Sequence, residues 1–184
     1  KKPWALKKVE DPLLTRGTVL IEVRAAAFNH RDIYINQGLY PGVNPPVIPG
    51  SDGAGIVREV GAGISRDLMG HEVLINPSHY WGSGERFQGK DYKILGMPDN
   101  GTFAEMARVP VEFIHDIHRH LSFEQAAALP LAGLTAYRAL FSRAKANARD
   151  RVLISGIGGG VALFALQFAV KEGCEVWVTS SKPE

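Results

Sequence analysis

A glycine-rich segment, SGIGGGVA over residues 155–162, has the composition of a phosphate-binding turn. It follows an apolar run and precedes a helix-prone stretch. Backbone N–H groups and the helix dipole can bind a pyrophosphate at such a junction, and glycine lets the backbone approach it. The segment departs from strict G-x-G-x-x-G, because the third small position falls on Val161 or Ala162. We predict a dinucleotide-binding turn formed by Gly156, Gly158, Gly159, Gly160 and Val161, with a turn that serves only close packing as the alternative.

The elements around this turn are those of a βαβ unit. Residues 151–155 and 174–179 form apolar runs typical of buried strands, and residues 161–172 form a helical run ended by Gly173. A right-handed crossover would make the two strands parallel and bury both faces. The sequence therefore predicts the start of a Rossmann-type parallel sheet.

The end of the second strand selects between the two nicotinamide cofactors. An acidic side chain about twenty residues beyond the turn would bind the ribose 2′-hydroxyl of NAD. The chain has Thr179, Ser180, Ser181 and Lys182 there, whose hydroxyls and ammonium can receive a 2′-phosphate. We therefore expect NADPH, while a solvated loop, or a Glu184 that folds back, remains the alternative.

Residues upstream of the glycine turn show a different sequence pattern. Short β-rich runs separated by glycine, proline and asparagine extend over residues 20–109 and predict a β-barrel-like domain, interrupted by an irregular region at 76–100 whose role we cannot assign. A helix is expected at 123–129, because Ser122 and Gln125 have capping-box spacing, and Pro130 interrupts it.

A second helical run is expected at 135–146. The change from short β-rich runs to helix-prone runs places a domain boundary near residue 120. The fold class is thus α/β with a β-rich domain, with domains at 1–120 and 121–184.

Composition favours a small-molecule ligand. The 184 residues are 45% hydrophobic, and the net charge is only +2 with scattered lysine and arginine, so nucleic acid and acidic membrane surfaces are not expected partners. No apolar run is long enough for a membrane span. The single cysteine, Cys174, excludes an internal disulfide and favours a cytoplasmic location. Both ends have the appearance of cuts, so we expect a piece of a longer protein.

Several strings in a fixed order resemble the medium-chain dehydrogenase/reductase superfamily. They are FNHRDIY, QGLYP, PGSDGAGIVREVGAG, GTFAEM and LAGLTAYRAL, and they cover nearly the whole chain. The resemblance implies a GroES-like β-barrel catalytic domain, a Rossmann NADP-binding domain and hydride transfer to a carbonyl or an activated double bond. Within the superfamily the chain looks most like the zinc-free quinone oxidoreductase and enoyl reductase branches.

The same resemblance argues against a metal. In zinc-dependent relatives a cysteine stands at the position of Asn29, a histidine at that of Ser51, and a third ligand near Leu131. None of these three residues is a typical ligand of catalytic zinc. Asp52 matches the acid that follows the histidine, and one carboxylate alone makes no site. We therefore expect neither a catalytic zinc nor, because residues 76–100 lack cysteines, a structural one.

Without a metal, reduction needs a proton donor and hydrogen-bond donors at the substrate. Tyr40 is the leading candidate, because related enoyl reductases have a tyrosine at the matching place; a half-buried loop aromatic is the alternative. Asn29 matches an asparagine that faces the nicotinamide in zinc-free branches. Thr135 matches a threonine that contacts the nicotinamide, although a helix-start hydroxyl fits equally well. Asp32 is expected to cap a short helix at 31–37, with orientation of a neighbouring residue as the alternative.

Four histidines occur in sequence contexts that resemble metal-binding motifs. His71 lies in the string GHE, but it follows the GAGIVREVG strand, so we expect a turn residue. His115, His118 and His120 are close in sequence, but no cysteine or regular spacing accompanies them. We expect a surface linker there.

The leading hypothesis is an NADPH-dependent reductase of quinones, enones or enoyl thioesters, in a homodimer as the resemblance implies. The alternatives are a carbonyl or alcohol oxidoreductase on the same fold and a non-catalytic NADPH-binding protein of the superfamily.

Overall fold

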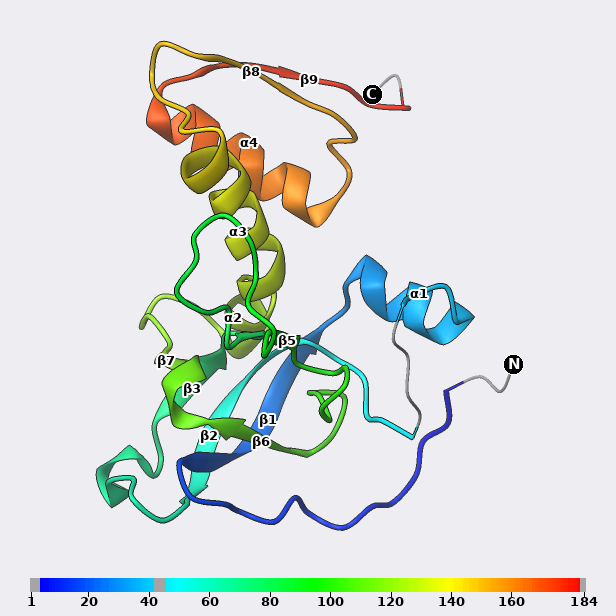
Figure 1. Ribbon diagram of the computed structural model, residues 1–184, viewed down its shortest axis with the longest axis vertical. Helices are drawn as coiled ribbons and strands as arrows, with labels where there is room; N and C mark the ends of the chain where they lie inside the picture. The colour runs from blue at the N-terminus through cyan, green and yellow to red at the C-terminus, as the bar shows by residue number, and fades with distance from the viewer. Residues whose placement is uncertain (1–3, 42–45, 183–184) are drawn as a thin grey trace. The chain divides into compact units, whose positions relative to one another are not determined.

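The computed structural model describes residues 4–41 and 46–182 (Figure 1). They form two compact units. The first unit comprises the chain up to Ser83 together with Gln88–Leu131, and the second comprises Gly84–Phe87 together with the chain from Ala132 onward.

An antiparallel sheet of five strands forms the first unit. In spatial order the strands are β6 (Met106–Pro110), β1 (Thr18–Ala27), β2 (Asp52–Val60), β3 (Glu72–Ile75) and β7 (Ile114–Asp116). The pairing of β1 with β2 contains two register shifts, between Leu20 and Ile21 and between Val23 and Ala25. Such irregularities bend a strand and increase its twist, as a curved sheet requires. The expected β-rich domain is confirmed.

One face of this sheet carries the hydrophobic core of the first unit. Alternate residues of β1, Val19 and Ile21, are fully buried and pack against Val57 of β2 and Val73 and Ile75 of β3. This alternation follows from the two-residue repeat of a strand, which sends successive side chains to opposite faces. The core therefore fixes which side of β2 faces the interior.

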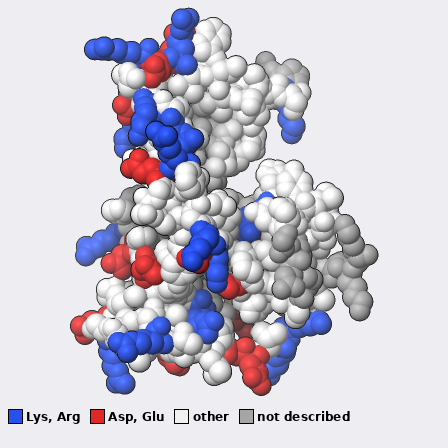
Figure 2. Space-filling view, viewed as in Figure 1, with Lys and Arg blue, Asp and Glu red and all other residues white. Residues whose placement is uncertain are grey.

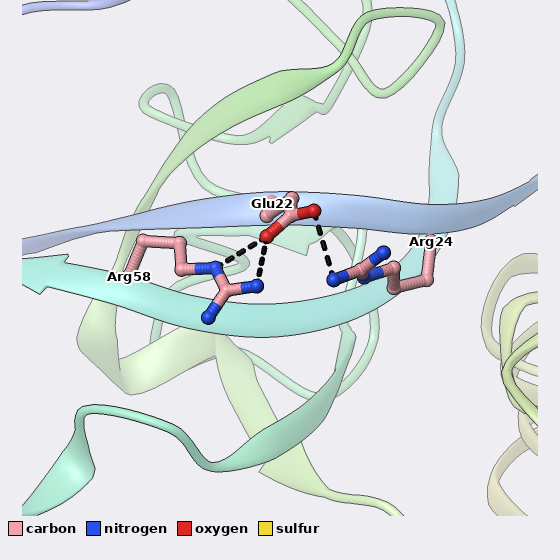
Figure 3. A network of polar contacts seen from close by, with 3 residues as sticks. All are labelled: Glu22, Arg24 and Arg58. Carbon is pink, nitrogen blue, oxygen red and sulfur yellow. Dashed lines mark hydrogen bonds and ion pairs between the residues drawn. The ribbon is translucent and has the colours of Figure 1, made fainter.

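The outer face of the same strands carries an ion-pair network (Figure 3). Glu22 on β1 lies between Arg24 of its own strand, whose Nη2 is 2.9 Å from Glu22 Oε1, and Arg58 on β2, which contacts Glu22 Oε2. All three side chains are partly exposed. Exposed pairs of this kind contribute at most about 1 kcal/mol, so the network supports the register of β1 and β2 without dominating the stability of the sheet.

Short elements connect the strands of the first unit. They are α1 (His30–Gln37), η1 (Arg66–Leu68), β4 (Ser78–His79), β5 (Lys93–Ile94), η2 (Val111–Phe113) and α2 (Phe123–Ala127). The region 76–100 contains only the two-residue pair β4 and β5.

The helix α2 begins at the predicted capping box. The Ser122 hydroxyl accepts a hydrogen bond from the Gln125 amide, and the Gln125 side chain accepts one from the Ser122 amide. Ala126 and Ala127 pack on Ala54 of β2. The compact first unit therefore extends through α2, whereas the sequence-based division at residue 120 assigned this helix to the second domain.

The second unit holds the expected βαβ unit. Strands β8 (Arg151–Ile154) and β9 (Glu175–Val178) are parallel, and α4 (Gly160–Glu172) connects them. Gly173 ends α4 with a φ of +92°, in the left-handed region that favours glycine. Predicted and observed bounds agree within about one residue, a normal discrepancy at helix and strand ends.

The preceding helix was predicted with the wrong start. The helical run begins at Pro130 with α3 (Pro130–Tyr137) and continues as a π-helical segment, η3 (Arg138–Arg143). The expected run of 135–146 was therefore too late at both ends. Proline at the first helical position needs no N–H partner, so Pro130 starts a helix here in addition to ending the previous one.

Charges of both signs are mixed on the surface. On the face that Figure 2 shows, Lys and Arg side chains lie beside Asp and Glu side chains rather than in one continuous stripe. Among residues 4–41 and 46–182, no helix has the length and apolarity that a membrane crossing needs.

Three glycines bring separate loops into contact just before Ser51. A Cβ at Gly101 would overlap the carbonyl oxygen of Gly50, and one at Gly96 would meet the same backbone. Gly50 itself has a φ of +95°, and a Cβ there would collide with Thr102 and Phe103. Glycine is therefore required for the loops after β5 and before β6 to pack against the start of β2.

Replacing Gly101 with alanine should destabilise the protein. The added methyl group meets backbone atoms that cannot rotate away, and overpacking of this kind costs about 2 kcal/mol or more. Chemical denaturation monitored by circular dichroism measures the change. Gly133→Ala is the matched control, because a Cβ at this helical position is 3.9 Å from the nearest atom, the Cδ1 of Phe164. Equal stabilities of the two variants would contradict the close-packing argument.

Candidate functional site

The helix α1 carries three of the polar residues of the first unit's site. Asn29 is its N-cap residue, and its backbone N–H donates a hydrogen bond of 2.8 Å to Asp32 Oδ2. The predicted capping role of Asp32 is thereby confirmed. Because Asp32 fixes the first turn, Asn29 and Arg31 are held in defined positions at the start of the helix.

Asp52, the first residue of β2, is the centre of the site. Its carboxylate accepts a hydrogen bond of 2.9 Å from Asn29 Nδ2 on one oxygen and one of 2.9 Å from the Leu131 backbone N–H on the other. The Thr102 hydroxyl donates to the Asp52 carbonyl oxygen at 2.7 Å. Asp52 is 1% exposed. Residues 29 and 131, which the sequence pointed to from far apart in the chain, therefore meet at one carboxylate.

Arg31 and Ser51 form the second part of the same cluster. Both are buried, and Arg31 Nη1 donates to the Ser51 hydroxyl and, at 3.0 Å, to the carbonyl oxygen of Leu95. The Ser51 hydroxyl donates to the same carbonyl at 2.8 Å. These bonds tie α1 to the segment after β5.

Tyr40 lies against this arginine. Its ring is half-buried, and the guanidinium carbon of Arg31 is 5.0 Å from the ring centroid, within the range of a cation–π contact. The structure thus brings Tyr40 into contact with Arg31, which is bonded to Ser51.

Burial controls the protonation of the two carboxylates. Desolvation raises the pKa of Asp52 to about 6, although the hydrogen bonds from Asn29 and Leu131 and the charge of Arg31 act in the opposite direction. Desolvation also raises the pKa of Asp32, against the hydrogen bond from Asn29 and the charge of Arg31. The site therefore contains a buried guanidinium whose positive charge favours the ionised forms of two buried carboxylates.

Sequence reasoning missed two members of this cluster. Arg31 was assigned no role, and Asp52 was set aside as an isolated carboxylate. The available signal was their position: Arg31 lies between the candidates Asn29 and Asp32, and Asp52 directly follows Ser51. The long-range contacts that give both residues their partners cannot be read from the sequence.

At Asn29, Ser51 and Leu131, where zinc ligands are expected in zinc-dependent relatives, the groups present are a side-chain amide, a hydroxyl and a backbone N–H. Asn29 and Leu131 both use an N–H group toward Asp52, and Ser51 is engaged with Arg31 and Leu95. In the part of the chain that the structure describes, no three His, Cys, Asp or Glu side chains are grouped in a way that could hold a metal ion.

The glycine turn of the second unit lies between β8 and α4, as predicted. Gly156 has a φ of +67°, and its N–H donates at 3.1 Å to the Thr179 hydroxyl at the end of β9. Gly159 is the N-cap residue of α4 and provides no side-chain cap, and the first turn of the helix contains no acid. A Cβ at Gly158 would have no atom within 4 Å. The turn therefore leaves open space in front of an uncapped helix N-terminus.

The remaining candidates of the second unit are exposed. Val161 is in the first turn of α4, Thr135 is on α3, and Ser180, Ser181 and Lys182 follow β9. The Ser180 hydroxyl accepts a hydrogen bond of 3.1 Å from the Lys182 backbone N–H. The hydroxyls and the ammonium group thus lie on one short segment that is open to solvent.

The four histidines in sequence contexts that resemble metal-binding motifs are not grouped as metal ligands within the described residues of the structure. His71 closes a turn after Gly70 and its Nδ1 is 3.0 Å from Asp116 Oδ1, so the turn interpretation is confirmed. His118 and His120 lie in the exposed linker with ring centroids 5.6 Å apart. The placement of His115 in that linker was wrong, because His115 pairs with Leu74 as part of β7.

Comparison with known proteins gives consistent matches. Residues 15–119 match the family described as the alcohol dehydrogenase GroES-like domain. A zinc-type alcohol dehydrogenase-like protein of Schizosaccharomyces pombe is 38% identical over 174 residues, which cover 93% of this chain and 50% of that protein. An acryloyl-coenzyme A reductase of Metallosphaera sedula is 34% identical over 191 residues, covering 99% of this chain and 57% of that protein.

Solved structures agree with these matches. The crystal structure of an NAD-dependent alcohol dehydrogenase superposes with a TM-score of 0.88 at 33% identity, covering 96% of this chain and 53% of that one. The chain spans about half the length of the relatives that it matches. On the GroES-like match, the sheet of the first unit and the parallel βαβ unit that follows it, the chain belongs to the alcohol dehydrogenase GroES-like domain family of the medium-chain dehydrogenase/reductase superfamily.

Proposed function

We propose that the protein is an NADPH-dependent oxidoreductase that reduces a quinone, an enone or an enoyl-type substrate without a catalytic zinc. The observation that carries this proposal is the buried cluster around Asp52, which uses N–H groups of Asn29 and Leu131 at positions where zinc-dependent relatives are expected to present ligands.

The residues present do not fit a zinc ion. Catalytic zinc takes its protein ligands from cysteine, histidine and carboxylate groups. Asn29 and Leu131 direct hydrogen-bond donors inward, which would point hydrogens at a cation. Arg31 adds a fixed positive charge to the same cluster and would repel one. No step of the proposed reaction therefore uses a metal.

The residues of the second unit fit a phosphorylated dinucleotide. Gly158 and Gly159, together with the uncapped start of α4, leave room and N–H groups for a pyrophosphate. Gly156, Gly160 and Val161 complete this turn, and we propose Thr135 as a contact for the nicotinamide. Ser180, Ser181 and Lys182 offer donors for a 2′-phosphate. This is the support for NADPH over NADH, whereas the similarity to an NAD-dependent alcohol dehydrogenase favours NADH.

When bound, the nicotinamide supplies the hydride. The chain's own residues must then hold the substrate and provide the proton. We assign Tyr40 as the proton donor, because its ring contacts Arg31 of the polar cluster and is only half-buried. Asn29 is assigned to orientation, because its side-chain Nδ2 donates to Asp52 and is held at the start of α1. General acid catalysis and positioning are the two contributions that the first unit makes.

The similarity to an acryloyl-coenzyme A reductase supports an activated double bond as the substrate. The similarities to zinc-type and NAD-dependent alcohol dehydrogenase proteins favour the second candidate, a carbonyl or alcohol oxidoreductase on the same fold. A cytoplasmic homodimer remains part of the proposal and rests on the single cysteine and on the resemblance alone.

Tyr40→Phe should lower kcat for enone reduction with NADPH by about a hundredfold or more, the typical contribution of a general acid. The KM for NADPH should not change, because the hydroxyl acts on the substrate. Steady-state kinetics with a small enone as substrate measures both values. Tyr34→Phe, which removes the hydroxyl of an exposed tyrosine on α1, is the matched control. Unchanged turnover in Tyr40→Phe would remove the tyrosine from the mechanism.

Lys182→Ala should raise the KM for NADPH by about tenfold and leave that for NADH unchanged. The reason is the loss of one charge-assisted hydrogen bond to the 2′-phosphate. Lys171→Ala removes another exposed lysine, in the last turn of α4, and serves as the control. Parallel changes for NADPH and NADH would show that Lys182 does not read the 2′-phosphate.

A further inference from the structure

Arg31 is an unusual charge for its environment. Its side chain is 8% exposed, and its Nε has no acceptor among the residues that the structure describes. Burying a guanidinium is costly unless charges and hydrogen bonds compensate it. Asp32 and Asp52 supply opposite charges nearby, while the direct acceptors of Nη1 are the uncharged oxygens of Ser51 and Leu95.

The guanidinium makes two kinds of contact, hydrogen bonds and a cation–π contact. Its Nη1 is bonded to Ser51 and to the Leu95 carbonyl, which lie at the start of β2 and just after β5. The guanidinium carbon also lies over the ring of Tyr40, 5.0 Å from its centroid. Arginine is suited to this double use, because its planar group stacks on aromatic rings and donates in its own plane, whereas lysine has no plane.

Tyr40 needs such support because helical structure has already ended before it. Gly38 terminates α1 with a φ of +68°, and the Leu39 N–H bonds back to the Tyr34 carbonyl. Tyr40 therefore lies on an irregular segment, and its ring contacts the side chain of Arg31, which is itself bonded to Ser51 and Leu95.

We infer that Arg31 is a positioning residue: it holds the ring of Tyr40 against the polar cluster so that the phenol hydroxyl is presented to the substrate. This inference rests on the proposed function, in which Tyr40 donates the proton. It adds a role for a residue that acts through another side chain and does not itself touch the reacting atoms.

A double-mutant cycle tests whether Arg31 acts through Tyr40. We expect Arg31→Met to lower kcat by at least about tenfold in the wild-type background, because misplaced catalytic groups lose rate steeply. In the Tyr40→Phe background, where no hydroxyl remains to be positioned, the same change should alter kcat by about twofold or less. Equal losses in both backgrounds would overturn the inference and make Arg31 a merely structural residue.

Arg31→Lys keeps the positive charge but removes the planar guanidinium. It therefore separates the effect of the charge from that of the planar group. We expect it to lower kcat as Arg31→Met does, because lysine has no planar group that could contact the ring while bonding both oxygens. Full activity of Arg31→Lys would contradict a role for the planar group. Arg66→Met, at an exposed arginine of η1, is the control for loss of an arginine.

Fluorine NMR of protein labelled with fluorotyrosine gives a readout that needs no turnover. The chain has five tyrosines, and the Tyr40 signal is identified by its absence in Tyr40→Phe. In Arg31→Met and Arg31→Lys this signal should move toward that of free fluorotyrosine while the others stay in place. An unmoved Tyr40 signal would overturn the positioning role. If the wild-type protein reduces none of the proposed substrates, the proposed function fails, and the NMR result still decides whether Arg31 positions the ring.

Discussion

The structure of the first unit's site depends on the burial of the Asp52 carboxylate between two N–H groups. A carboxylate that is 1% exposed persists only if its oxygens are paired, and here one oxygen is bonded to the Asn29 amide and the other to the Leu131 backbone. These bonds join the start of α1, the start of β2 and the start of the helical run at Pro130. Satisfying one buried charge therefore assembles residues that are far apart in sequence.

The surrounding packing makes this arrangement possible. Gly50, Gly96 and Gly101 allow three backbone segments to meet without side chains between them, directly before Ser51. Arg31 then reaches Ser51 and Leu95 across that junction and provides a positive charge near Asp32 and Asp52.

The sequence predicted the elements whose signals are local. The capping box at Ser122, the end of α4 at Gly173 and the parallel pairing of β8 with β9 follow from residue type and spacing over short distances. The start of α3 at Pro130 was missed because proline both ends and begins helices. The roles of Arg31 and Asp52 were missed for a different reason: their partners lie up to 79 positions away in the chain, and no local pattern encodes such contacts.

We propose that the cluster around Asp52 works without a metal. Elemental analysis of the purified, active protein tests it most directly, with turnover measured on the same sample before and after exhaustive dialysis against a zinc chelator. We predict zinc far below one atom per chain and unchanged turnover after dialysis. About one zinc per chain, removed by the chelator together with the activity, would contradict the claim.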